Sequence, residues 1–198
     1  MTKRTPVRTG LWLLLLPLLL AGCHRGEPWA TKDISGLMPD LAFQLTEANR
    51  HKKVGAADYH GQIVMMYFGY MHCPDVCPTT LTHLGSAVKA LGTQASEVRI
   101  LFVSVDPKRD TLPDLSRYAN YFGPQVVGLR GEQTALRKLT KRYRVTFGYD
   151  KPDANGDYNV SHSSAVYVFD RNGKVRLLVR PTDKTAAITR DLKRLIVE

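Results

Sequence analysis

Cysteine is scarce in this sequence: the 198 residues include only Cys23, Cys73 and Cys77. Cys73 and Cys77 are the one pair of cysteines close in the sequence, whereas small secreted domains are usually stabilised by several disulfides. A disulfide scaffold is therefore excluded. With 43% apolar and 23% charged residues, the chain has the composition and length to bury a full hydrophobic core in one domain.

The sequence also lacks a basic stripe interleaved with aromatic residues, which is typical of nucleic-acid-binding proteins. Its formal net charge is +10, and it stays moderately basic without Lys3, Arg4 and Arg8, which lie in a segment that we expect to be removed. We interpret the excess of positive charge as a solvated surface that faces anionic lipid, and we predict no nucleic-acid partner. No internal repeat is present.

No apolar run is long enough for a comfortable membrane span, which needs roughly 20 residues. The run Leu11–Leu20, after a basic start and before small residues, predicts a signal peptide over 1–22. Leu20–Cys23 resembles a bacterial lipobox, which makes Cys23 the expected lipidation site; an uncleaved signal anchor is the alternative. Either way we expect a tether over 23–36 and a domain over 37–198, held to the membrane of a bacterial cell envelope on its periplasmic or outer face.

The rest of the chain alternates short apolar runs with helical patterns, which predicts an α/β sandwich with a central sheet flanked by helices. A β-hairpin is expected within Leu37–Tyr59, before the sheet. The other predicted strands are Ile63–Phe68, Val98–Val105, Val126–Leu129, Ala165–Phe169 and Val175–Val179. The predicted helices are Pro78–Leu91, a helix from Asp110 or Thr111 to Tyr121, Glu132–Tyr143 and Asp183–Val197.

Cys73 and Cys77 stand where the first central strand turns into the first helix. Pro78 suits a first helical position, which places Cys77 near the helix start. The unpaired N–H groups there stabilise an anion, so a cysteine at this place is expected to ionise readily. The spacing allows the two sulfur atoms either to form a disulfide or to bind one soft ion such as Cu(I), or Zn²⁺.

A metal site needs a third ligand, and imidazole is the usual candidate. His162 stands just before the strand Ala165–Phe169. A histidine in a loop is usually a surface residue, but in a thioredoxin-like arrangement this loop lies beside the two cysteines. His72 adjoins Cys73, and adjacent residues rarely point at one centre. The remaining histidines are expected to be solvated or in the tether: His24, His51, His60 and His83.

Methionine thioethers are a further class of copper ligand. Met65 and Met66 fall inside the buried strand and are better interpreted as core residues, whereas Met71 is close enough to the cysteines to line the mouth of a site. Asp75, between the cysteines, is either a solvated loop charge or an electrostatic aid to a metal or partner.

The stretch around these cysteines resembles the Cys-Pro-Asp-x-Cys-Pro motif of the Sco/SenC proteins. Further blocks occur in the same order along the chain, and the resemblance covers about residues 37–196. The matching blocks are Gly69–Leu81, Ser104–Thr111, Val127–Gly131, Tyr143–Val145 and His162–Ser163.

The resemblance implies a membrane-tethered thioredoxin-like domain with a central mixed sheet, which binds one copper, as Cu(I) or Cu(II), through Cys73, Cys77 and His162. It implies service in assembly of the copper A centre of cytochrome c oxidase, with the copper-bearing oxidase subunit as partner and a periplasmic copper donor or thiol reductant as a further one. Many relatives have Asp before the ligand histidine. Here Ser161 stands there, and a hydroxyl cannot supply that negative charge.

Two alternatives to a copper chaperone remain. In a thiol–disulfide oxidoreductase, Cys73 and Cys77 would be a redox-active pair and His162 would be dispensable; the Trp-Cys-x-x-Cys pattern usual in thioredoxins is absent. A peroxiredoxin-like peroxidase would need Thr two or three positions before its reactive cysteine, where Met71 and His72 stand. The chaperone and reductase roles can coexist, and we expect no other catalytic residue.

Overall fold

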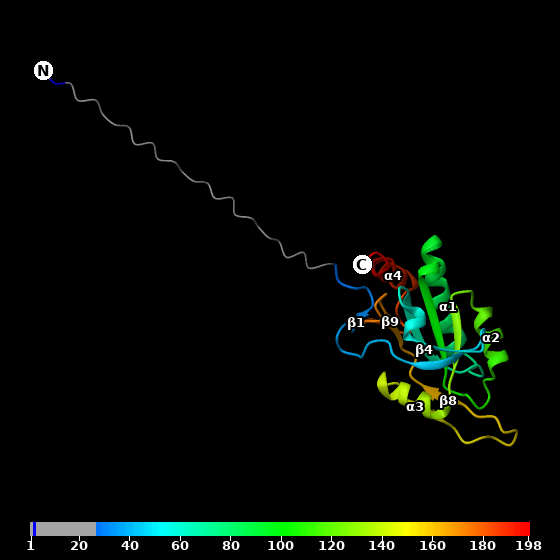
Figure 1. Ribbon diagram of the computed structural model, residues 1–198. Helices are drawn as coiled ribbons and strands as arrows, with labels where there is room; N and C mark the ends of the chain where they lie inside the picture. Colours follow the sequence, from blue (N-terminus) through cyan, green and yellow to red (C-terminus); the bar gives the residue numbers. More distant parts are fainter. Residues whose placement is uncertain (1, 3–26) are drawn as a thin grey trace.

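The computed structural model of the chain describes residue 2 and residues 27–198 (Figure 1). The predicted signal peptide, apart from residue 2, and the predicted lipidation site Cys23 lie outside this part. None of the helices among the described residues is long and apolar enough to cross a membrane.

The centre of the fold is an eight-stranded mixed sheet, as predicted. In its middle, β4 pairs in parallel with β5 along its whole length, β5 pairs in parallel with β6, and β9 runs antiparallel to β4. The strand order is β1 (Lys32–Asp33), β10 (Val175–Val179), β9 (Val166–Phe169), β4 (Ile63–Gly69), β5 (Val98–Ser104), β6 (Val126–Arg130), β2 (Gln44–Glu47) and β3 (Lys52–Gly55). The hairpin expected within Leu37–Tyr59 is β2–β3.

Helices cover both faces of this sheet. They are α1 (Val76–Lys89), α2 (Leu112–Tyr121), α3 (Gln133–Arg142) and α4 (Thr185–Val197), with short 3-10 turns at Ala56–Tyr59 and Gly92–Glu97. On one face Tyr118 of α2 packs against Phe102 of β5, their ring centroids 5.4 Å apart, and α1 lies beside α4. On the other face Tyr143, directly after α3, packs against Phe169 of β9. The predicted thioredoxin-like sandwich is therefore confirmed.

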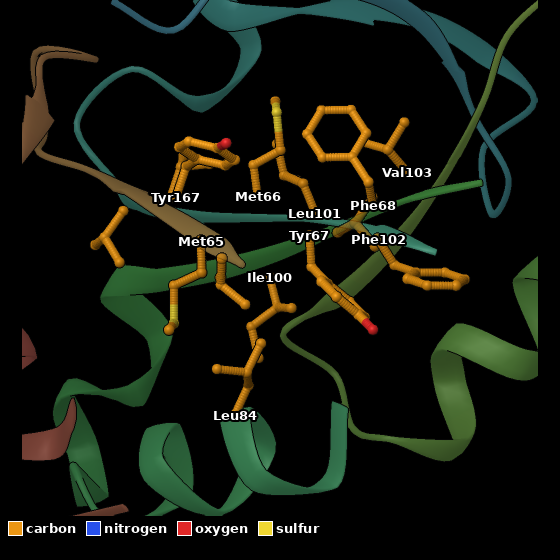
Figure 2. Packing of buried hydrophobic residues seen from close by; sticks show 14 of the residues in the cluster. Met65, Met66, Tyr67, Phe68, Leu84, Ile100, Leu101, Phe102, Val103 and Tyr167 are labelled. Carbon is orange, nitrogen blue, oxygen red and sulfur yellow. The ribbon is translucent and has the colours of Figure 1, made fainter. Parts of the chain in front are cut away.

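The strand β4 is buried over its whole length. Its side chains alternate between the faces: Figure 2 shows Met65 and Tyr67 on the side of Leu84 from α1, and Met66 and Phe68 on the other side. A strand covered on both faces needs apolar residues at every position, which explains the unbroken apolar run in the sequence. Met65 and Met66 are core residues, as predicted.

Part of the segment expected to be a tether belongs to the fold. Lys32–Asp33 form β1 and pair antiparallel with β10. Just before it, the backbone N–H and the hydroxyl of Thr31 donate to Asp191 of α4, at 2.7 and 2.8 Å. This attachment could not be predicted from the local sequence, which is polar, because the residues that Thr31 and β1 contact lie near the other end of the chain.

Candidate metal centre

The turn between β4 and α1 carries both cysteines of the predicted site. The helix begins at Val76, two residues earlier than predicted, with Asp75 as the residue before its first turn. Pro78 is still tolerated because N–H groups in the first turn of a helix have no intrahelical partner. Cys77 therefore lies in the first turn, as expected.

The two sulfur atoms differ in exposure. Cys77 is fully buried, whereas Cys73 is half-buried, and both thiols are free. The backbone N–H of Cys77 points to Sγ of Cys73 at 3.4 Å. Gly69 ends β4 where a side chain would not fit, since a Cβ there would lie 2.9 Å from Sγ of Cys77. The absence of a side chain at Gly69 therefore leaves room for the buried sulfur atom of Cys77.

His162 reaches the cysteines from a short second sheet. It ends β8 (Val160–His162), which pairs with β7 (Phe147–Tyr149), so it lies in a strand and the predicted loop position is wrong. Its Nε2 lies 3.2 Å from Sγ of Cys77, and its Nδ1 lies 3.1 Å from the carbonyl oxygen of Ser163. A proton on Nδ1 can be donated to that carbonyl, which leaves the Nε2 lone pair facing the sulfur.

The protonation of these groups departs from the sequence-based expectation. Burial raises the pKa of Cys73, but N–H donors led by the backbone of Cys77 outweigh it, and the net pKa is lowered. Burial raises the pKa of Cys77 to about 12, although this residue is the one inside the helix. Burial also lowers the pKa of His162. Cys73 is therefore the thiol that ionises first, and His162 is a neutral imidazole at neutral pH.

The donor atoms of Cys73, Cys77 and His162 all lie within 4.8 Å of one another. Two sulfur atoms and one neutral imidazole suit a soft or borderline ion, and copper in either oxidation state accepts this donor set. The three predicted ligands thus converge, and they fit one copper ion.

Other candidates from the sequence do not join this group. His72 faces Asp110. His51 and His60 are exposed, and His83 is half-buried on α1. Asp75 is exposed and accepts a hydrogen bond from the hydroxyl of Thr79 at 3.2 Å, so its charge sits at the helix start.

Ser161, the residue before His162, is exposed and makes its hydrogen bond outside the group of three donor atoms. Its hydroxyl donates to the backbone carbonyl of Gly148 in β7, at 3.3 Å. The serine therefore supports the small sheet that carries His162.

Two tyrosines of the site were missed at the sequence level. Tyr67 and Tyr70 place their rings edge-on to the imidazole of His162, with centroids 6.1 and 5.9 Å away. The Tyr67 hydroxyl is buried without a hydrogen-bond partner, and burial raises its pKa. For Tyr67 the available signal was a hydroxyl inside an otherwise apolar strand, whereas Tyr70 lies just after the end of that strand.

Comparison with known proteins places this geometry in a family. The family model described as SCO1/SenC matches residues 37–197. A curated bovine relative, "Protein SCO2 homolog, mitochondrial", is 34% identical over 189 residues, which cover 85% of this chain and 69% of the bovine protein.

Solved structures show the same likeness. The copper-bound structure of ScoI from Bradyrhizobium japonicum is 35% identical, with a TM-score of 0.72, over 79% of this chain and 98% of that chain. The solution structure of apo Sco1 from Thermus thermophilus is 30% identical, with a TM-score of 0.74, over 86% of this chain and 99% of that chain.

Proposed function

Because the chain belongs to the SCO1/SenC family, we propose that it is a membrane-tethered copper metallochaperone. It binds one copper ion through Cys73, Cys77 and His162 and delivers it for assembly of the copper A centre of cytochrome c oxidase. The single observation that carries the proposal is the convergence of these three donor atoms within 4.8 Å.

The chemistry of the site suits delivery rather than storage. The two sulfur atoms match Cu(I), and the imidazole matches either copper state. Cys73 is half-buried, so an incoming ligand from a partner can approach the ion from this side. The partner is the copper-bearing oxidase subunit, with a periplasmic copper donor upstream. Lipid on Cys23 holds the domain on the outer face of the bacterial membrane.

A second function, thiol–disulfide exchange, is favoured by the difference between the two thiols. The Cys73 thiolate would attack a partner disulfide and form a mixed disulfide, releasing one partner thiolate. Cys77 would then lose its proton and attack Sγ of Cys73, which releases the second partner thiolate and leaves a Cys73–Cys77 disulfide. The partner gains two electrons, and this chain loses them.

Copper titration of the reduced full chain separates these functions. His162→Ala should weaken Cu(II) binding about tenfold or more, with loss of the thiolate-to-copper absorption. It should weaken Cu(I) binding less, since both sulfur atoms remain. His83→Ala, a histidine on the helix of Cys77, is the matched control and should change neither. If His162→Ala binds Cu(II) as the original chain does, the pair is a redox centre and thiol exchange is the function.

A further inference from the structure

A second group of metal-ligating side chains lies close to the turn that bears Cys73 and Cys77. It consists of His72, Asp106 and Asp110, whose donor atoms are all within 4.8 Å of one another. Asp106 and Asp110 follow β5, and His72 follows β4, so the parallel pairing of these two strands brings the three residues together. None of them belongs to the group formed by Cys73, Cys77 and His162.

The oxygen atoms of Asp110 are unequally satisfied. Oδ2 accepts hydrogen bonds from the Ser104 hydroxyl at 2.6 Å and from the Met71 backbone N–H at 3.1 Å. Oδ1 is buried and has no hydrogen-bond partner, and the side chain is 0% exposed. A buried acceptor without a partner is costly, so this oxygen needs a ligand.

The charge of the Asp110 carboxylate also lacks a dedicated cation among the described residues. Arg109 is a nearby half-buried cation, and its Nε donates to Asp106 at 2.6 Å. Asp106 also accepts from the Tyr158 hydroxyl at 2.8 Å. Asp106 and Asp110 are two buried carboxylates beside this guanidinium, which donates its hydrogen bond to Asp106. Within the part of the chain that the structure describes, the Asp110 carboxylate is paired with His72 alone, and the side chain of His72 is 48% exposed.

The spacing between His72 and Asp110 fits two ligands of one ion. Nδ1 of His72 lies 3.5 Å from Oδ1 of Asp110, which is long for a hydrogen bond. Two ligands on a tetrahedral ion with bonds of about 2.1 Å lie about 3.4 Å apart. A cavity of about 400 Å³ opens beside His72 and gives an ion and its water ligands access to this residue. Its charged lining consists of the carboxylates Asp150, Asp153 and Asp157 and the cations Arg109 and Lys151.

We propose that His72 and Asp110, with Asp106, form a second metal site, for a divalent ion of the Zn²⁺ and Cu²⁺ class. Nitrogen and oxygen donors without sulfur select such ions over Cu(I). The site lies one residue from Cys73 along the chain, so the protein would hold a divalent ion and a thiolate-bound ion side by side. This goes beyond the proposed chaperone function, which uses neither His72 nor Asp110.

The test uses the full chain carrying Cys23→Ser, Cys73→Ser and Cys77→Ser, so that no thiolate competes. Co²⁺ is the probe, because its absorption reports the coordination geometry and any sulfur ligand. We expect one Co²⁺ per chain with no sulfur-to-metal absorption. His72→Ala in this background should weaken binding about tenfold or more, and Asp110→Asn should do the same.

The matched controls are His83→Ala and His162→Ala, which should leave Co²⁺ binding unchanged. Because His72 is exposed, its variant tests the site even if Asp110→Asn does not fold. Absence of Co²⁺ binding, or unchanged binding in His72→Ala, overturns the proposal, and so does loss of binding in His162→Ala. Copper binding by the intact cysteines is measured separately, so either proposal can fail alone.

Discussion

The Sγ atom of Cys77 lies 3.2 Å from Nε2 of His162, although 85 positions separate the two residues in the sequence. Cys77 is held by the first turn of α1 and His162 by the small β7–β8 sheet. The cysteine pair thus depends on local structure, while the third donor depends on the whole fold. Partial unfolding of β7–β8 would remove the imidazole and leave the two thiols in place.

The two thiols should form a reversible disulfide with each other. Their sulfur atoms lie within 4.8 Å, and rotation of the half-buried Cys73 side chain can close the remaining distance. After mild oxidation, mass spectrometry with alkylation should show the loss of two hydrogen atoms, confined to the peptide that contains Cys73 and Cys77. Full alkylation of both residues after oxidation would show that their geometry forbids the bond.

Cys73 should react with iodoacetamide before Cys77 at neutral pH. The pKa of Cys73 is lowered, so more of it is thiolate there, whereas the pKa of Cys77 is raised to about 12 and it stays protonated. As pH rises, the Cys73 rate should level off first and the Cys77 rate should continue to increase. The measurement is peptide mapping of alkylation across pH. Parallel pH profiles for both residues would contradict the assignment.

Gly69→Ala should destabilise the protein and disturb the metal centre. The new Cβ would lie 2.6 Å from Cε2 of Phe102 and 2.9 Å from Sγ of Cys77, and both residues are fully buried in the core. Overpacking of this kind costs about 1–3 kcal/mol. Urea unfolding and copper titration measure the two effects. The control is Gly148→Ala, whose Cβ would meet Ser161 at an ordinary 3.4 Å; equal stability of the two variants would refute the argument.

Cys23→Ser should block lipid attachment. The lipobox-like stretch Leu20–Cys23 motivates this prediction. Labelling cells with a radioactive fatty acid should mark the original chain and leave the variant unlabelled, with the variant misprocessed or released from the membrane. Normal processing and membrane retention of the variant would favour an uncleaved anchor instead.

Long apolar segments were predictable from the sequence because their pattern follows from burial. The strand Val175–Val179 was predicted with its observed bounds, and β4 and β5 to within one residue. Two of the shortest strands were not predictable. Lys32–Asp33 and Val160–His162 carry little apolar pattern, and each pairs with a strand that the local sequence does not reveal.

The grouping of Cys73, Cys77 and His162 was predictable from the sequence, but the electrostatics of the group was not. The motif around Cys73 and the resemblance together indicated all three donors. The position of Cys77 in the helix suggested an easily ionised thiol, yet burial raises its pKa, and the half-buried Cys73 is the more acidic thiol. Likewise, the sequence indicated Asp110 only as a possible first residue of a helix. Its closeness to His72 depends on the pairing of β4 with β5.

The attachment of Thr31 to Asp191 has a mechanical consequence. If the proposed lipid on Cys23 tethers the chain, a pull on its N-terminal end reaches the folded domain through residues 27–33. The hydrogen bonds from Thr31 and the β1–β10 pairing share that load with contacts closer to the tether, such as the hydrogen bonds from Ala30 to Asp191 and from Arg194 to the carbonyl oxygen of Glu27. The load therefore enters at one edge of the sheet, where β10 and β9 separate β1 from β4, and through α4, which lies beside the helix that bears Cys77.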